Sequence, residues 1–226
     1  ESKDQIEDWL GSEAVAGAKF LDCGCGSGIA SAGAYQLGAK VTSFDFDFES
    51  KVATETIKKR IVLNQSDHRD REWVVVQGDL LDRRFCSKLG KFDIVYCWGV
   101  AHHTGDLVGA MERLSEFGCQ DSLLWVAIYN DQGWKSKLWY EVKFLFNKSF
   151  LFRFVISFVL FWTHFLPRGM NIFVDWLDWI GGFPFEVMAS QSVCDFFKAR
   201  GFVADRIEVC GSRSGCNQFL FRKVKT

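Results

Sequence analysis

The sequence predicts an α/β protein with a doubly wound, seven-stranded sheet that is mostly parallel and ends in an antiparallel hairpin. Short apolar runs alternate with helical patterns across residues 18–130, and strict alternation of strand and helix is typical of a doubly wound fold. The runs are continuously apolar, as expected for parallel strands that helices cover on both faces. Near the end of the chain, a short polar segment at 212–215 joins two further strand-like runs, which predicts an antiparallel pair.

Apolar runs predict five buried strands at residues 18–24, 40–47, 73–79, 92–100 and 122–130. Sequences of small or amphipathic character predict helices between strands at residues 31–39, 50–64 and 105–117. A last helix is predicted at 191–202, ending at Gly201, and two final strands follow at 202–211 and 217–224.

These elements divide the chain into three parts. Residues 1–130 form the ligand-binding core of the sheet. Residues 131–190 are rich in aromatic side chains and lack any strand rhythm, which predicts a helical insertion after the fifth strand. Residues 191–226 supply the last helix and the hairpin that complete the core sheet.

Composition limits the classes of partner and compartment. The chain has 226 residues and a formal net charge of −1, and its basic residues are scattered, so no nucleic-acid partner is expected. Its eight cysteines are dispersed and contain no pair with metal-ligand spacing, so we expect no metal site. Reduced, buried thiols of this kind predict a cytoplasmic protein.

Three alternating glycines follow the first predicted strand. Gly24, Gly26 and Gly28 come after Asp22, at the carboxyl end of a strand, where open α/β sheets bind ligands. Glycine allows a sharp turn and lets a ligand lie against the backbone. The dinucleotide pattern G-x-G-x-x-G would need glycine at Ile29, so a pyrophosphate ligand is disfavoured.

Acids end the next two strands. Asp45 lies 17 residues after Gly28, where a carboxylate can accept hydrogen bonds from both hydroxyls of a ribose. Asp47 is a second candidate for this role, and either acid alternatively caps the helix that begins near Glu49. Asp79 follows the third strand and can accept an adenine amino hydrogen, or can cap the next helix.

Together these residues and the segment "FDIVYCWGVAHHTGD" resemble the class I S-adenosylmethionine (SAM) dependent methyltransferases, in particular those related to ubiquinone-biosynthesis enzymes. The resemblance implies a Rossmann-like fold, SAM as methyl donor and S-adenosyl-L-homocysteine as product. It implies a glycine loop under the methionine and ribose of SAM, followed by a helix whose amino end favours the ligand's carboxylate. The residues expected to bind SAM are Asp22, Gly24, Cys25, Gly26, Gly28, Asp45, Phe46, Gly78, Asp79, Leu80, Trp98 and Gly99.

Histidines at the end of the fourth strand are the candidate catalytic residues. His102 or His103 can accept a proton near neutral pH, and we expect only one of them to face the site, because adjacent residues of an extended segment point opposite ways. The alternative is that both brace the loop. The candidate acceptor-binding residues are Tyr129, Asn130, Arg168, Asp175 and Glu186. Glu186 alternatively pairs with Arg168 and anchors the insertion.

The aromatic insertion predicts the kind of acceptor. Such cover suits a small hydrophobic or aromatic acceptor, whose methylation proceeds by in-line displacement. Residues 154–166 lack charge over 13 positions, too few to span a bilayer, which needs about 20. Residues 149–166 therefore predict either peripheral membrane contact or a lid against the domain or a second subunit of a homodimer. The alternative function is a membrane-associated or scaffolding protein that keeps the fold without turnover.

Overall fold

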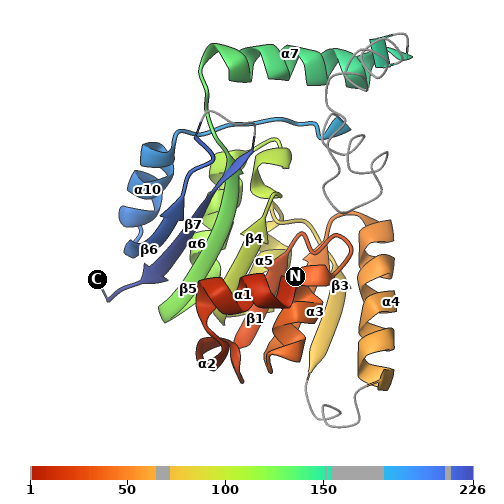
Figure 1. Cartoon of the computed structure of the whole chain (residues 1–226), viewed down its shortest axis with the longest axis vertical. Coiled ribbons are helices and arrows are strands. Elements are labelled where there is room, and N and C mark those ends of the chain that lie inside the picture. The colour runs from red at the N-terminus through yellow and green to blue at the C-terminus, as the bar shows by residue number, and fades with distance from the viewer. Residues whose placement is uncertain (1, 65–71, 151, 154–180, 212–214, 226) are drawn as a thin grey trace.

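The computed structural model describes residues 2–64, 72–150, 152–153, 181–211 and 215–225. A single sheet of seven strands runs in the order β3-β2-β1-β4-β5-β7-β6 (Figure 1). The strands are β1 Lys19–Cys23, β2 Lys40–Asp45, β3 Trp73–Gln77, β4 Phe92–Trp98, β5 Gly118–Tyr129, β6 Phe202–Glu208 and β7 Cys216–Lys223. Strands β1 to β5 are parallel, and β7 is antiparallel to both β5 and β6. The predicted fold is thus confirmed.

Helices cover both faces of the sheet. The helices are α1 Ser2–Leu10, α2 Ser12–Val15, α3 Ile29–Gln36, α4 Phe48–Asn64, α5 Arg83–Leu89, α6 Leu107–Phe117, α7 Trp134–Lys148 and α10 Ser190–Lys198, with a 3-10 turn η2 at Ala101–His103. One core layer joins the sheet to α1, α2, α3 and α4, and the other joins it to α5, α6 and α10. This double cover explains why the strand sequences are apolar on both faces.

Helix α1, at the start of the chain, was not predicted from the sequence. Its Trp9 stacks on the buried Trp125 of β5, with ring centroids 4.7 Å apart. A Cβ at Gly33 of α3 would lie 3.0 Å from the backbone nitrogen of Lys3, so this glycine permits the close packing of α1 on α3. The amphipathic first residues therefore close the sheet's α3 face.

Two boundaries differ from the predicted ones. Strand β5 begins at Gly118, directly after α6, rather than at 122, and Asp121 within it has φ of 63°. The last strands are joined by residues 209–215 rather than by a four-residue turn, because β6 ends at Glu208 and β7 begins at Cys216. Positions 212–214 lie outside the described residues.

The chain after β5 crosses the carboxyl ends of the parallel strands. Helix α7 lies above this edge of the sheet in Figure 1. The returning chain lies beside the end of β5, because Met188 donates its backbone N–H to the Tyr129 carbonyl over 3.1 Å. Of the predicted insertion, only α7 and short flanking segments are described, so the proposed division at 130 and 190 stays a prediction. No helix in the described part of the chain is long and apolar enough to cross a membrane.

Candidate functional site

A cavity of about 520 Å³ opens at the carboxyl edge of the sheet, a volume that suits a small-molecule ligand. The residues that line it are Gly24, Phe44, Asp45, Phe46, Gly78, Asp79, Leu80, Leu81, Gly99, Val100, His103, Thr104, Phe183 and Pro184. Seven of the expected SAM-binding residues and one of the two candidate histidines are among them. Four successive strands, β1 to β4, thus place their carboxyl-terminal loops around one space.

The glycine loop between β1 and α3 needs glycine for two physical reasons. Gly24, Gly26 and Gly28 all have positive φ, at 75°, 51° and 81°. A Cβ at Gly24 would lie only 2.4 Å from a methyl group of Val100, and one at Gly28 would lie 2.8 Å from Thr54. At Gly26 a Cβ would meet nothing within 4 Å, so this glycine leaves open space beside the backbone.

The carboxylate of Asp45 is held by two backbone groups. The Gly26 N–H donates to its Oδ2 over 2.8 Å, and the Asp47 N–H donates to its Oδ1 over 2.9 Å. Each carboxylate oxygen can accept a second hydrogen bond, so Asp45 keeps acceptor capacity beside the cavity that it lines. Asp47 instead accepts the Ser50 N–H over 2.8 Å in the first turn of α4. The helix-capping alternative therefore describes Asp47 rather than Asp45.

The third acid belongs to the cavity and not to a helix cap. Asp79 accepts the Leu81 N–H over 2.8 Å in a tight turn, whereas Asp82 caps α5 by accepting from Arg84 and Phe85. A Cβ on the neighbouring Gly78 would lie 2.0 Å from the Phe85 ring. Glycine at this position thus lets the α5 aromatic ring pack under the turn that holds Asp79.

The two histidines have different surroundings. They lie in the 3-10 turn Ala101–His103 rather than in the extended segment that we expected, yet only His103 lines the cavity. His102 is 1% exposed, and its Nδ1 accepts the Tyr129 N–H over 3.4 Å. Burial lowers the pKa of His102 well below its usual value. His102 therefore braces the end of β5 as a neutral imidazole.

His103 is oriented by the returning chain. Its Nδ1 lies 2.7 Å from the Pro184 carbonyl oxygen, which only accepts, so Nδ1 carries the proton in the neutral ring. The Nε2 atom then holds the free lone pair, and it makes no hydrogen bond to the described residues. Burial lowers the pKa of His103, and the bond to Pro184 offsets part of this effect.

Five expected SAM-binding residues are absent from the cavity lining, namely Gly26 and Gly28 of the glycine loop together with Asp22, Cys25 and Trp98. Asp22 is 1% exposed and accepts the Ser31 hydroxyl over 2.5 Å, and burial raises its pKa to about 6. Cys25 is buried, with the Thr54 hydroxyl 3.3 Å from its sulfur. Trp98 donates its ring N–H to Gln218 over 3.0 Å. Asp22 therefore joins β1 to α3, Cys25 joins the glycine loop to α4, and Trp98 contacts β7.

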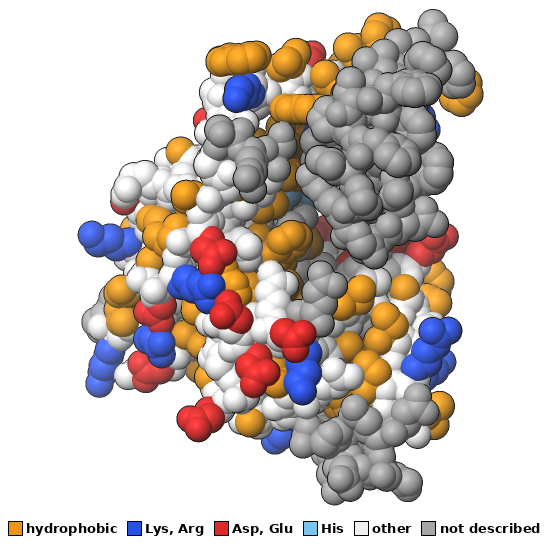
Figure 2. Space-filling model, in the orientation of Figure 1, with side chains coloured by type: hydrophobic (Ala, Val, Ile, Leu, Met, Phe, Trp, Pro, Cys, Tyr) orange, Lys and Arg blue, Asp and Glu red, His pale blue; other side chains and the backbone are white. Residues whose placement is uncertain are grey.

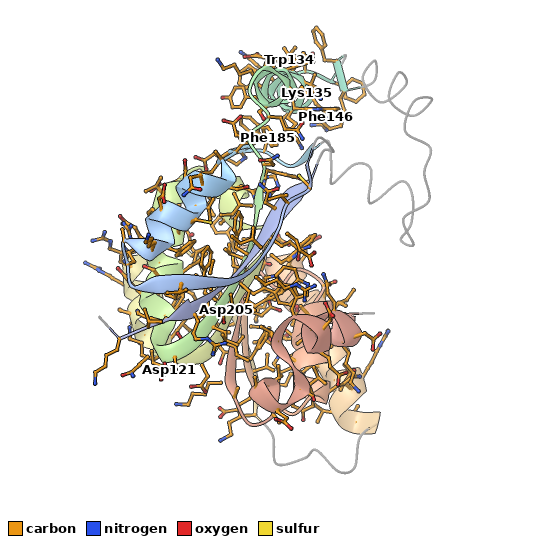
Figure 3. The ribbon with its side chains drawn as sticks, turned by 60° about the vertical axis from the view of Figure 1, so that its left-hand side comes forward. Asp121, Trp134, Lys135, Phe146, Phe185 and Asp205 are labelled. Atoms are coloured by element: carbon orange, nitrogen blue, oxygen red, sulfur yellow. The ribbon has the colours of Figure 1, made fainter. Side chains whose placement is uncertain are left out.

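Three of the five expected acceptor residues, Tyr129, Asn130 and Glu186, are among the described residues. Tyr129 and Asn130 line a second, small cavity with Lys143 and Phe185, and Asn130 also accepts from Asn217 over 3.0 Å. In Figure 3, Phe185 lies between α7 and the sheet. Burial raises the pKa of Tyr129 to about 12 and lowers that of Lys143 to about 8. Arg168 and Asp175 lie outside the described residues.

Glu186 joins the insertion to the histidine loop. Its Oε2 accepts the Leu107 N–H at the start of α6 over 3.0 Å, and its own N–H donates to the His102 carbonyl. Burial raises the pKa of this carboxyl. The expected partner Arg168 is outside the described residues, so the described role of Glu186 is to fix residues 183–186 beside the cavity.

Sequence reasoning missed six of the lining residues. They are Phe44, Leu81, Val100, Thr104, Phe183 and Pro184. Val100 and Thr104 lie close to His102 and His103 in the sequence, so the motif that identified the histidines could also have identified them. Phe183 and Pro184 lie about 80 positions after His103, and the only signal for them in the sequence is that they precede the candidate Glu186 in the segment "FPFE". Within the described ranges, no group of three or more metal-ligating side chains occurs.

Comparison with known families decides the class of protein. A family model described as a methyltransferase domain matches residues 4–148. The chain belongs to this methyltransferase family. The match includes β1 to β5 and runs to the end of α7, whereas Phe183 and Pro184 of the cavity lining lie outside it. No curated protein sequence matches the chain.

Solved structures with the same fold are distant in sequence. The magnesium protoporphyrin IX methyltransferase ChlM from Synechocystis PCC 6803, solved with bound SAH, is 15% identical, with a TM-score of 0.61 over 98% of this chain and 82% of that one. A putative sarcosine dimethylglycine methyltransferase from Galdieria sulphuraria is 12% identical, with a TM-score of 0.62 over 100% and 85%. An O-methyltransferase family protein from Burkholderia thailandensis is 11% identical, with a TM-score of 0.59 over 99% and 56%.

The family match and the fold together confirm the expected class I SAM-dependent methyltransferase. These solved structures share the overall fold of the chain, and the matched family supplies the activity. The finer resemblance to the ubiquinone-biosynthesis type stays a prediction, as do the roles of the individual site residues.

Proposed function

We propose that this methyltransferase transfers the methyl group of SAM to a small, hydrophobic or aromatic acceptor. The observation that supports this proposal is the composition of the cavity lining. The lining contains Gly24, Asp45 and Asp79, and also His103, Phe183 and Pro184. The two carboxylates suit an adenosine, and apolar residues next to a single base suit an acceptor with few polar groups.

The residues present fit the donor. Asp45, oriented by the Gly26 and Asp47 amides, would accept from the ribose hydroxyls, and Asp79 would accept from the adenine amino group. Gly24, Gly78, Gly99 and Leu80 would supply backbone walls. The open side of Gly26 would admit the methionine part, with the amino end of α3 facing its carboxylate. When bound, SAM supplies an activated sulfonium methyl group.

His103 is the proposed general base. Its Nε2 would take the proton of an acceptor hydroxyl or amine, while the Pro184 carbonyl holds Nδ1 and fixes the ring. The lowered pKa keeps the ring neutral at pH 7, as a base requires. His102 contributes by bracing β5, and Tyr129 lies beside it with ring centroids 4.0 Å apart.

The remaining predicted residues have supporting roles in this proposal. Asp22 and Cys25 hold the loop that carries Gly26, and Trp98 secures the end of β4. Glu186 fixes the Phe183–Pro184 segment, which forms an apolar wall and excludes water from the transfer. Tyr129 and Asn130 would contact the distal part of the acceptor. Arg168 and Asp175 stay candidates for the same end.

The experiment is a transfer assay with methyl-labelled SAM and a panel of phenols, quinols, lipid-like alcohols and polar amines. We expect labelled product only from hydrophobic or aromatic acceptors. His103→Gln should lower turnover by 100-fold or more, the usual scale for a general base, while SAM affinity stays within about twofold. Label found only in polar acceptors would refute the acceptor class. Unchanged turnover in His103→Gln would refute the base.

A further inference from the structure

Helix α7 carries an exposed apolar and basic surface that the proposed chemistry does not use. Trp134 and Leu138 are 70% and 54% exposed, and Phe150 and Phe152 just beyond the helix are 84% and 46% exposed. Figure 2 shows hydrophobic side chains along this part of the surface, at the top of the view, with a basic side chain beside them. We call Trp134, Leu138, Phe150 and Phe152, with the lysines described next, the outer face.

Helical geometry separates the outer face from the side that packs on the protein. Trp134 and Leu138 are four residues apart, so they lie one above the other on the helix. Ser136, Lys143 and Phe146 are the buried residues of α7 and lie on the opposite side. In Figure 3, Trp134 lies on the side of α7 away from the sheet, whereas Phe185 lies on the sheet side. Trp134 therefore points away from the sheet, whereas Leu138 also lines a groove with Phe185 and Val187.

The charge of the outer face is positive on balance. Lys135, Lys137 and Lys148 are exposed and flank the apolar stripe, and the exposed Glu141, three residues after Leu138, adds one negative charge on the same side. Arg153, beyond the helix, lies 5.4 Å from the Phe146 ring centroid and therefore belongs to the side of α7 that packs on the protein. Lysines that flank an apolar stripe can bury their stems and keep their ammonium groups at a headgroup layer. A tryptophan at one end suits the same boundary.

We infer that the outer face of α7 docks on the surface of an anionic lipid bilayer, with the helix parallel to the membrane plane. The net positive charge is complementary to anionic headgroups, and no described helix is apolar and long enough to span the bilayer. The helix lies above the carboxyl edge of the sheet, so docking would bring that edge close to the lipid (Figure 1). A hydrophobic acceptor dissolved in the bilayer would then have a short path to the site.

The test uses the full chain and sedimentation with vesicles of phosphatidylcholine, with or without one quarter phosphatidylglycerol. We expect binding to the anionic vesicles that weakens with salt and is at least tenfold weaker for the neutral vesicles. Lys135→Gln with Lys137→Gln should weaken binding roughly 25-fold, at about fivefold for each basic residue near the surface. Trp134→Ser with Leu138→Ser should weaken it at least tenfold.

Matched controls lie elsewhere on the surface. Lys59→Gln with Arg60→Gln on α4, and Val203→Ser with Val209→Ser around β6, should each leave vesicle binding within twofold. No sedimentation of the wild-type chain with anionic vesicles, or equal losses in the control pairs, would overturn the inference. So would a stable dimer in light scattering that Trp134→Ser with Leu138→Ser dissociates, because the outer face would then bind a second copy.

Thermal unfolding and SAM titration of each variant separate this inference from the proposed function. Intact SAM binding with lost vesicle binding supports a docking surface distinct from the cavity. Vesicle binding without SAM binding would contradict the proposed donor site and leave the docking surface standing.

Discussion

Asp45→Asn separates the ribose-binding role of this acid from a purely structural one. The Asp45 carboxylate accepts the Gly26 N–H at 2.8 Å and the Asp47 N–H at 2.9 Å, one on each oxygen. The asparagine side chain has one oxygen and one NH₂ group, so its oxygen could accept from only one of the two backbone N–H groups. The other N–H would face the NH₂ group, which is itself a donor. The half-buried site should therefore lose about 1–3 kcal/mol of folding stability, the cost of one unsatisfied group.

Asp45→Asn should also weaken SAM binding directly, in addition to lowering the folding stability. Hydrogen bonds to a charged group contribute about 1.5–3 kcal/mol, so losing them would weaken SAM binding roughly 10- to 150-fold. Asp47→Asn is the matched control two residues away. Asp47 is exposed and accepts only in the first turn of α4, where asparagine is an equally good cap. We expect SAM affinity within about twofold and stability within about 0.5 kcal/mol.

The assay is calorimetric titration with SAM at a temperature where urea unfolding shows each variant to be folded. Equal SAM affinity in Asp45→Asn and the wild type would refute the ribose assignment. An equal loss in Asp47→Asn would show that loop structure, rather than a direct contact, sets the affinity.

Three further predictions follow from the geometry. Gly24→Ala should lower the free energy of unfolding in urea by about 2–4 kcal/mol, because residue 24 has a positive φ of 75° and the added Cβ would lie 2.4 Å from Val100. Adding Val100→Ala should restore only the part of this loss that comes from the steric clash. Full restoration of stability in the double variant would contradict the contribution of the positive φ. The pH profile of turnover should rise with the deprotonation of His103, at a pH below the ordinary histidine value, and His103→Gln should lack this rise. Because burial lowers the pKa of His102, the unfolded state binds its proton first as pH falls. Stability should therefore fall below about pH 6.5, by up to about 1.4 kcal/mol per pH unit, and His102→Asn should flatten this slope in unfolding measured across pH.

The sequence predicted most of the fold because the sheet is covered on both faces. Each parallel strand is a continuous apolar run, and the strand ends carry the glycines and acids that mark the ligand edge. The prediction placed Gly24, Asp45, Asp79 and His103 at one edge, and the structure brings them around one cavity. Motifs that follow one another along the chain thus lie around the same cavity in the structure.

What the sequence did not predict depends on contacts between distant segments. Asp47 and Asp79 were each predicted either to bind the ligand or to cap a helix. The hydrogen bond from Ser50 identifies Asp47 as the helix cap, and the hydrogen bond from Leu81 places Asp79 in a turn beside the cavity. The pattern V-x-H-H does not say which histidine is buried, because the local 3-10 turn decides it. Pro184 reaches His103 from 81 positions away, and no local propensity encodes such an approach.

The cavity bounded by Asp45, Asp79 and His103 is the proposed SAM site. The most direct measurement is calorimetric titration of the wild-type chain with SAM, repeated in the presence of S-adenosyl-L-homocysteine. We expect one SAM site per chain, with the demethylated product competing for it. A folded chain that binds neither compound at millimolar concentration would contradict the proposed SAM site.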